Sequence, residues 1–442
     1  MSSREHRLHD AMQALPFDPA DAKSALAQLP EAAAVYALCG AEAHQEPYIG
    51  RTPNLRSRLE RLLQPSPKHP RRLQLAGLVR RIEWRLTGSE FESLLLQFQL
   101  LEDQYGLKAL ERMHLRSPAF LRYLGTNPYP RITVTHRPSV READWVYGPF
   151  ASRAAAERFA DEALKLFLLR RCTDDLAPDP SHPGCVYSEM KMCLAPCYKG
   201  CTDERYHEEA AAVESFLATR GESKFVPLRT QRDEASANLE FETAAALHAQ
   251  VQKVESVRAL AGELVRPLSE LRAVILQASP NPDEVAVFLF EKASLRGPAA
   301  FSTLGMRIQN EQSSSSSLFA QPLGLEPILE KQGSEKTEDA SAEQTAALEA
   351  QPNYETPAPI KLPRGMLEAR LEATFGSLAE LSRPPSATER QAHLALLKRW
   401  YYRPEARRSG EICFADDEGH WPLKSILRSI GRVAAARLKP EA

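Results

Sequence analysis

The sequence has no apolar run long enough to cross a lipid bilayer, and its N-terminal stretch, MSSREHRLHDAMQALPF, lacks the apolar core of a signal peptide. It also has almost no excess of charge, because 56 Lys and Arg residues stand against 58 Asp and Glu residues. The first two absences predict a cytoplasmic protein without a membrane partner. The third excludes an overall field that draws the chain to nucleic acid, so any basic surface must be local.

The 442 residues, 43% of them hydrophobic, are enough for about two to four domains with cores of their own. Short strand patterns are interspersed with longer helical ones, which predicts an α+β, multidomain protein. The predicted regions are 1–115, a small β-β-α-β-α domain; 116–202, a hairpin (130–150), a helix and a cysteine-rich segment; 203–262, a helical region; 263–308, a short β region; 309–359, a disordered linker; and 360–442, a mostly helical region.

Residues 34 to 63, AVYALCGAEAHQEPYIGRTPNLRSRLERLL, place Tyr36 and Tyr48 on two short apolar segments that predict a β-hairpin. The leucine spacing that follows predicts a helix with Thr52 as its N-cap. Residues 51 to 85 hold ten basic and two acidic side chains, which is enough to follow a phosphate backbone. On charge alone, a solvated helix face is the better explanation.

The order of these pieces is more specific than their charge. VY, then YIG, then NLRSRL and a Glu-rich helix resemble the GIY-YIG nuclease domain, and more closely the N-terminal domain of the UvrC family, the incision subunit of bacterial nucleotide excision repair. The resemblance implies that Tyr36 and Tyr48 orient and deprotonate the attacking water and that Arg58 stabilises charge on the phosphate. Arg51, the fourth residue of the implied catalytic set, stands where the family usually has lysine, and either side chain can contact phosphate. The residues expected to contact DNA are Arg51, Arg56, Arg58 and Arg61.

The helix predicted from Ser89 to Gly106 departs from the family at one position. The family's helix, close to EREALLLEANLIK, has a late glutamate that binds the single divalent metal, whereas SEFESLLLQFQLLE has Gln97 there. A neutral amide is a poorer ligand than a carboxylate for Mg²⁺ or Mn²⁺. We therefore predict the nuclease fold with cutting weakened or lost, and a need for Mg²⁺ or Mn²⁺ only if the nuclease is active.

Five of the seven cysteines fall between residues 172 and 201, more than ordinary buried thiols explain. Thiols stay reduced in the cytoplasm, so we expect ligands or buried thiols instead of disulfides. Four thiolates suit either zinc or an iron–sulfur cluster, and the segment lacks the paired C-x₂-C knuckles of common zinc folds. The surrounding sequence again resembles UvrC, which implies a [4Fe–4S] cluster, with zinc as the alternative. The implied ligands are Cys172, Cys185, Cys193 and Cys197.

Residues 224 to 259 carry a helical pattern that breaks near residues 239 to 241, which predicts a helical hairpin. An ordinary core helix would show the same apolar stripe. The order resembles the UVR motif, through which UvrC pairs with the UvrB helicase, although His248 and Ala249 stand where the family has Arg and Asp. Phe241 would be the buried anchor of that contact. The implied partner-contacting residues are Leu239, Phe241, Glu242, Ala245, Leu247 and Val251.

Residues 398 to 414, KRWYYRPEARRSGEICF, mix aromatic side chains with arginines. Such a mixture can stack bases and hold phosphate, but a folded helix–strand corner is the commoner explanation. The resemblance to UvrC covers about residues 25 to 262, and we find no sign of that family's RNase H-like or helix-hairpin-helix domains.

Three functions follow as hypotheses. The first is a UvrC-like repair protein that binds DNA through a GIY-YIG domain and a UvrB-like helicase through the hairpin, with incision weakened or lost. The alternatives are an active single-site DNA-incising endonuclease and a helicase-binding adaptor without DNA contact.

Overall fold

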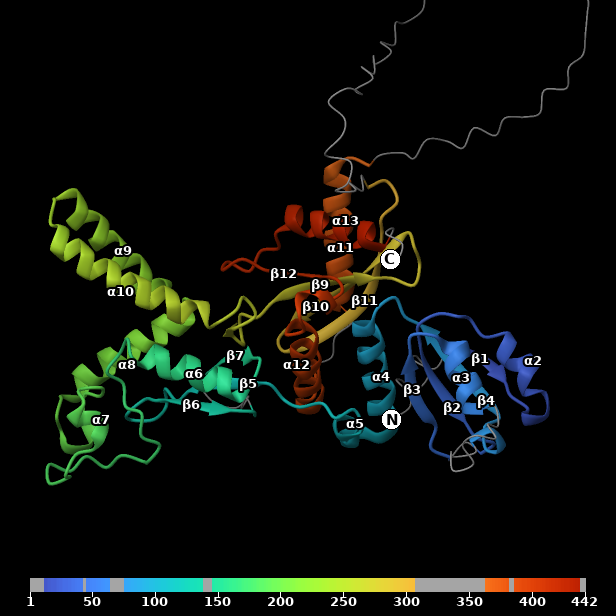
Figure 1. The fold of residues 1–442 in the computed structure, drawn as a ribbon, viewed down its shortest axis with the longest axis horizontal. Helices are drawn as coiled ribbons and strands as arrows, with labels where there is room; N and C mark the ends of the chain where they lie inside the picture. Colours follow the sequence, from blue (N-terminus) through green and yellow to red (C-terminus); the bar gives the residue numbers. More distant parts are fainter. Residues whose placement is uncertain are drawn as a thin grey trace, which may run out of the picture.

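The structure is a computed structural model of the chain. It describes residues 12–42, 45–63, 75–137, 145–306, 362–380 and 385–437. These residues form three sheets of four strands each, with helices between and around them (Figure 1). None of the helices described combines the length and the apolar character that a bilayer crossing requires. The linker predicted at 309–359 lies outside the described residues.

The first sheet is antiparallel and has the order β1-β4-β2-β3. Its strands are β1 (Gln13–Pro16), β2 (Ala34–Cys39), β3 (Tyr48–Thr52) and β4 (Arg81–Leu86). The predicted hairpin and third strand are therefore present, and β1 is a strand that the sequence pattern did not show. Two helices, α2 (Ala22–Ala27) and α3 (Leu55–Leu63), cover one face.

The start of α3 differs from the prediction. The side chain of Asn54, not that of Thr52, accepts a hydrogen bond from the Ser57 amide (2.9 Å) and so satisfies a free N–H of the first turn. Thr52 instead holds the turn before the helix, because its hydroxyl donates to the Asn54 carbonyl (2.9 Å). The expected leucine stripe is confirmed, since Leu55, Leu59 and Leu63 are all buried.

The other face of the first sheet is covered by α4 (Glu90–Tyr105), whose Ser89 cap and Gly106 end match the prediction. Leu96 and Leu100 of α4 pack on Val35. The opposite side of α4 packs against the third sheet and α12 (Ala387–Tyr401), with Phe91 edge-on to Phe288 at 5.1 Å. Figure 1 shows α4 between the first sheet and α12. A helix with apolar side chains all round is therefore buried on both sides.

The second sheet has the order β6-β5-β7-β8. The prediction of a hairpin at 130–150 is wrong, because β6 and β7 do not pair with each other; each pairs with β5, which lies between them. Helices α6 and α8 pack on this sheet. The elements are α5 (Ala109–Arg112), β5 (Ala119–Tyr123), β6 (Ile132–Thr135), β7 (Trp145–Phe150), α6 (Arg153–Leu164), α7 (Val186–Glu189), α8 (Asp203–Ala218) and β8 (Arg266–Pro267).

The predicted helical hairpin is present as α9 (Glu222–Ala237) and α10 (Phe241–Ala259). The break falls where the sequence indicated it, and Leu239 has a left-handed φ of 62° at the turn. Figure 1 shows the two helices side by side, extending away from the three sheets.

The third sheet joins two segments that the sequence analysis treated as separate regions. β12 (Glu411–Phe414) pairs with β9, so 263–306 and the helical segment after residue 362 share one antiparallel sheet of order β11-β10-β9-β12. Alternate residues bury both faces, one against α4 and α12 and the other against α11 and α13. The remaining elements are β9 (Ala273–Ala278), β10 (Glu284–Glu291), β11 (Ser294–Ser302), α11 (Arg364–Glu380) and α13 (Leu423–Arg437).

The segment at 398–414 is a folded helix–strand corner. Trp400 is buried and donates its indole N–H to the Ser409 carbonyl (2.9 Å). The hydroxyl of Tyr402 donates to the Pro149 carbonyl (2.8 Å), which ties the corner to the second sheet. Stacking of bases on this segment is therefore not supported for these two rings.

Candidate active site

Three of the predicted catalytic side chains meet on the α3 face of the first sheet. In the β2–β3 pairing, Tyr36 stands opposite Gly50, and its ring lies 6.3 Å from the ring of Tyr48. Arg58, on α3, donates from Nε to the Tyr36 hydroxyl at 3.5 Å. Gly50 is needed for this approach, because a Cβ there would lie 2.6 Å from the Tyr36 ring.

The two tyrosines differ in exposure. Tyr36 is fully buried at its ring, whereas Tyr48 is 43% exposed. Burial raises the pKa of Tyr36, against the opposing effect of Arg58. The Tyr36 hydroxyl is therefore neutral at pH 7, so it orients a bound group by hydrogen bonding and is a weak base. Hydrogen bonding to Tyr36 raises the pKa of Arg58, which stays cationic beside both hydroxyls.

Arg51 projects toward α4. Its guanidinium lies 3.2 Å from the carboxylate of Glu90, which also accepts two hydrogen bonds from Arg403, at 2.5 and 2.8 Å. Arg399 is a further cation near this carboxylate. The Glu90 carboxylate thus pairs with Arg51 and Arg403 and lies near a third arginine, Arg399 of α12.

The other two predicted DNA contacts differ from each other. Arg56 donates to the Leu29 carbonyl (2.7 Å) and to Glu31 (2.6 Å), so it is already occupied within the domain. Arg61 is exposed and donates to the Ser57 carbonyl of its own helix (3.0 Å). Arg58 and Arg61 are therefore better placed for phosphate than Arg56.

Gln97 lies on α4, seven residues after Glu90, and is half-buried. Among the described residues, no three His, Cys, Asp or Glu side chains are placed so that they could hold a metal ion. Glu92, five residues before Gln97, is buried and accepts from the Gly88 amide (2.8 Å), and burial raises its pKa. It serves the start of the helix, so it does not replace a carboxylate at position 97.

The four predicted cysteine ligands are free thiols in one neighbourhood. Burial raises the pKa of Cys193 to about 11, and the nearby thiols of Cys172, Cys185 and Cys197 add to the effect. Burial also raises the pKa of Cys197. A bound metal would favour the thiolate form of both Cys193 and Cys197.

A buried cation lies beside these thiols. Arg170 is 1% exposed and its Nη1 lies 3.7 Å from the Cys172 sulfur, whereas its Nη2 has no hydrogen-bond partner. A buried guanidinium with an unused donor favours negative charge on the sulfurs. The charge of Arg170 would favour thiolates in a cysteine-bound cluster or zinc site, but the four sulfurs are not arranged as a metal site in the described part of the chain.

The predicted partner-contacting residues divide along the hairpin. Leu239 and Phe241 are 71% and 67% exposed at its turn. Glu242 and Ala245 are also exposed, and Leu247 is half-buried. The prediction for Val251 is wrong, because it is 2% exposed and faces the interior of the protein.

The sequence analysis did not predict two features of the site. The contact of Glu90 with Arg403 joins residues 313 positions apart, and no local pattern predicts it. The buried Arg170 stands next to Arg171 and Cys172 in a run that reads as a solvated helix end. Its signal would have been its position two residues before the first cysteine of the cluster.

Comparisons with known proteins place these observations in a family. Residues 32–105 match the model of the UvrC-like GIY-YIG domain, and residues 120–216 match the middle domain of the UvrC/Cho excinucleases. No solved structure matches the chain.

The similar curated proteins are UvrABC system protein C of several bacteria. That of Alcanivorax borkumensis is 30% identical over 48% of this chain and 34% of its own length. Those of Carboxydothermus hydrogenoformans and Ruminiclostridium cellulolyticum are 27% and 29% identical, over 63% and 54% of this chain and 45% and 39% of their own lengths. The chain thus spans between a third and a half of these relatives. The two adjoining domain matches and the relatives agree, so residues 32–105 and 120–216 of the chain are the GIY-YIG and middle domains of the UvrC family.

Proposed function

We propose that this protein is a nucleotide excision repair factor that binds DNA at its GIY-YIG domain and whose own incision is weakened or lost. One observation carries the proposal. Tyr36, Tyr48 and Arg58 converge on one face, whereas the α4 position that carries the metal-binding glutamate in the family holds the amide of Gln97. In this proposal, the three side chains that would bind phosphate lie together, whereas the residue at the metal-ligand position is changed to glutamine.

The assembled part has the chemistry of a phosphate site. Arg58 supplies a cation at the two phenols, and Tyr48 is open to solvent, so a phosphodiester laid on β3 would meet Arg58 and the hydroxyls together. Arg61, one turn further along α3, extends the cationic line. A divalent ion would supply several kcal/mol of charge stabilisation, and Gln97 offers it only a neutral oxygen.

An active single-site endonuclease is the second candidate, because the other three catalytic positions are intact and in contact. The two candidates differ in whether a neutral ligand at position 97 still recruits Mg²⁺ or Mn²⁺. Both require DNA at the Tyr36–Arg58 face.

We also propose that Cys172, Cys185, Cys193 and Cys197 hold a [4Fe–4S] cluster, or zinc as the alternative. The buried Arg170 beside Cys172 supports negative charge on the sulfurs. Such a group would tie the segment between α6 and α8 together. An absorption spectrum of anaerobically purified protein, with iron and zinc counted per chain, distinguishes the two; a chain with neither metal contradicts both.

The hairpin is proposed to bind a UvrB-like helicase. The exposed pair Leu239 and Phe241 supports this, because two large apolar side chains at the turn of an extended hairpin are available to a partner.

DNA binding is tested by fluorescence anisotropy of a labelled duplex. Arg58→Glu should weaken binding at least about tenfold and lower its salt dependence, because it removes one phosphate contact and adds a repulsive charge. Lys23→Glu is the matched control, since it reverses one exposed charge on α2 of the same domain and should leave affinity nearly unchanged. Equal affinity of the Arg58→Glu variant and the wild type would favour the adaptor that never touches DNA.

A further inference from the structure

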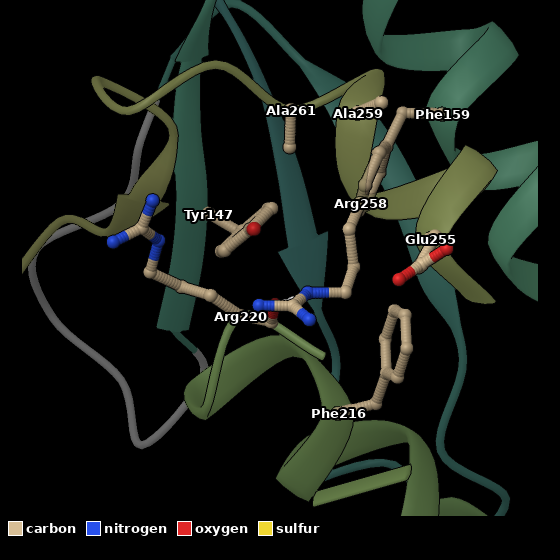
Figure 2. A pocket seen from close by; sticks show the side chains of 8 residues that line it. All are labelled: Tyr147, Phe159, Phe216, Arg220, Glu255, Arg258, Ala259 and Ala261. Carbon is tan, nitrogen blue, oxygen red and sulfur yellow. Dashed lines mark hydrogen bonds between the residues drawn. The ribbon is translucent and has the colours of Figure 1, made fainter. Parts of the chain in front are cut away.

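A cavity of about 290 Å³ lies at the base of the α9–α10 hairpin, against the second sheet (Figure 2). Three aromatic side chains line it: Tyr147 from β7, Phe159 from α6 and Phe216 from α8. Two arginines complete the wall, Arg220 from the α8–α9 turn and Arg258 from α10. None of the residues assigned above to DNA, cysteine ligation or helicase contact lines it. Its size is near the lower end of small-ligand sites.

A tyrosine hydroxyl lines this cavity without a hydrogen-bond partner among the described residues. Tyr147 is 2% exposed, and its hydroxyl makes no hydrogen bond within the described part of the chain. Burial raises its pKa to about 12, and Arg220, Arg266 and Arg258 oppose the shift, so the hydroxyl is a neutral donor among cations. Figure 2 shows it between the side chains of Arg220 and Arg258. The hydroxyl is therefore available to donate to an acceptor bound in the cavity.

The arginines around this hydroxyl differ in whether their guanidinium groups already have hydrogen-bond partners. Arg258 donates to the Arg220 carbonyl (3.1 Å) and pairs with Glu222. Arg266 donates to the Glu263 carbonyl at 3.1 and 2.8 Å. The Arg220 guanidinium has no hydrogen bond or ion pair with any described residue, and its backbone holds a left-handed φ of 53°, which is uncommon for arginine.

The cations also repel one another. Burial lowers the pKa of Arg266 and the charge of Arg220 lowers it further, whereas Asp417 and Glu263 oppose the shift. Arg220 and Arg266 also line a neighbouring hollow with these two acids. Glu255 also lines the cavity, and Figure 2 shows it on the far side of Arg258 from Tyr147. Arg220, Arg258 and the Tyr147 hydroxyl therefore offer hydrogen-bond donors on one side of the cavity, and the Phe159 and Phe216 side is apolar.

We propose that this cavity binds a phosphate-bearing ligand of mononucleotide size, with its phosphate on Arg220 and the Tyr147 hydroxyl and its base against Phe159 and Phe216. Guanidinium and phenol donors match phosphate oxygens, and aromatic walls match the flat face or edge of a base. A free nucleoside monophosphate and the 5′-phosphorylated end of a DNA strand present this same chemistry. The inference goes beyond the proposed function, because the cavity lies outside the GIY-YIG domain.

The test is calorimetric titration of the full chain with dAMP, deoxyadenosine and inorganic phosphate. Binding of dAMP should be at least about tenfold tighter than binding of either part alone, because both ends of the ligand are held. Tyr147→Phe and Arg220→Gln should each weaken dAMP binding at least about tenfold without changing Tm. Arg229→Gln, an exposed arginine on α9 away from the cavity, is the control and should bind as the wild type does.

Competition with oligonucleotides assigns the source of the ligand. Displacement of dAMP by a 5′-phosphorylated strand but not by its 5′-hydroxyl twin supports the site and assigns it to DNA ends. Binding of dAMP that neither strand displaces supports the site and assigns it to free nucleotides. No binding of dAMP or of the phosphorylated strand at millimolar concentration, or equal affinities for the wild type and both cavity variants, would overturn the proposal.

Discussion

At the scale of single residues, the ring of Tyr36 decides which residue is allowed at position 50. Gly50 faces that ring across the β2–β3 pair, and an added Cβ would lie 2.6 Å from ring carbon and from the hydroxyl oxygen. The ring is fully buried and has no free space to move into, because Leu55 and Leu59 of α3 pack over it. The glycine of the YIG motif thus has a steric function that is separate from catalysis.

Gly50→Ala should destabilise the protein by about 1–3 kcal/mol, because the ring or the strand must move to admit the methyl group. Urea unfolding measures the loss, and the same variant should weaken duplex binding because the Tyr36–Arg58 contact shifts. Gly77→Ala is the control, since a Cβ there meets nothing within 4 Å. Equal stability of the two variants would show that the ring can move freely.

The sequence predicted much at this scale. The positions of Tyr36, Tyr48 and Arg58 followed from motif order, and the structure brings them together as a site requires. The sequence did not predict the ion pair of Arg56 with Glu31. Residue spacing shows which face of a helix carries a side chain, but not which distant acid lies beside it.

At the scale of elements, α4 shows what a local pattern can and cannot predict. Its start, its end and its helical state were all readable from SEFESLLLQFQLLEDQYG, since the cap and the closing glycine are local signals. Its second packing surface was not readable, because that surface is formed by β10 and α12, hundreds of residues away. The predicted hairpin at 130–150 failed for the related reason that β5 inserts between two strands that are adjacent in sequence.

The turn of the α9–α10 hairpin yields a second prediction. Phe241→Ala should abolish co-purification with a UvrB-like helicase and leave the unfolding free energy nearly unchanged, because the ring is 67% exposed in the free protein. Val226→Ala, a 51% exposed apolar residue on α9, should keep the complex. Retention of the partner by the Phe241→Ala variant would place the contact elsewhere.

At the scale of the whole molecule, ion pairs join an N-terminal segment of the chain to a C-terminal one. Glu90 on α4 holds Arg51 of β3 and Arg403 after α12, beside the aromatic contact of Phe91 with Trp400 at 5.4 Å. The domain boundaries predicted from composition separated 263–308 from 360–442, but β12 completes their common sheet. Pairing between strands so far apart leaves no periodic signal, so sequence reasoning had no means to join them.

This contact makes stability depend on acid. Arg403 holds the pKa of Glu90 at about 2, well below the ordinary 4.5. The ion pair of Glu90 with Arg403 therefore stabilises the folded state fully above pH 4.5, and this stabilisation is lost as the pH falls from 4.5 toward 2. Because the carboxylate is 38% exposed, the effect should be about 1 kcal/mol or less. Glu90→Gln should flatten that part of the urea-unfolding profile, whereas an unchanged slope would mean that other carboxylates account for it.

The most direct test of the account is nicking of supercoiled plasmid in Mg²⁺ or Mn²⁺ by the wild type and by Gln97→Glu. Gln99→Glu adds the same charge to another half-buried position of α4 and is the control. We expect weak or no nicking by the wild type and by Gln99→Glu, and metal-dependent nicking by Gln97→Glu, which restores a carboxylate at the position where the family binds its metal. Full metal-dependent nicking by the wild type, unchanged in Gln97→Glu, would contradict the proposal that position 97 disables incision.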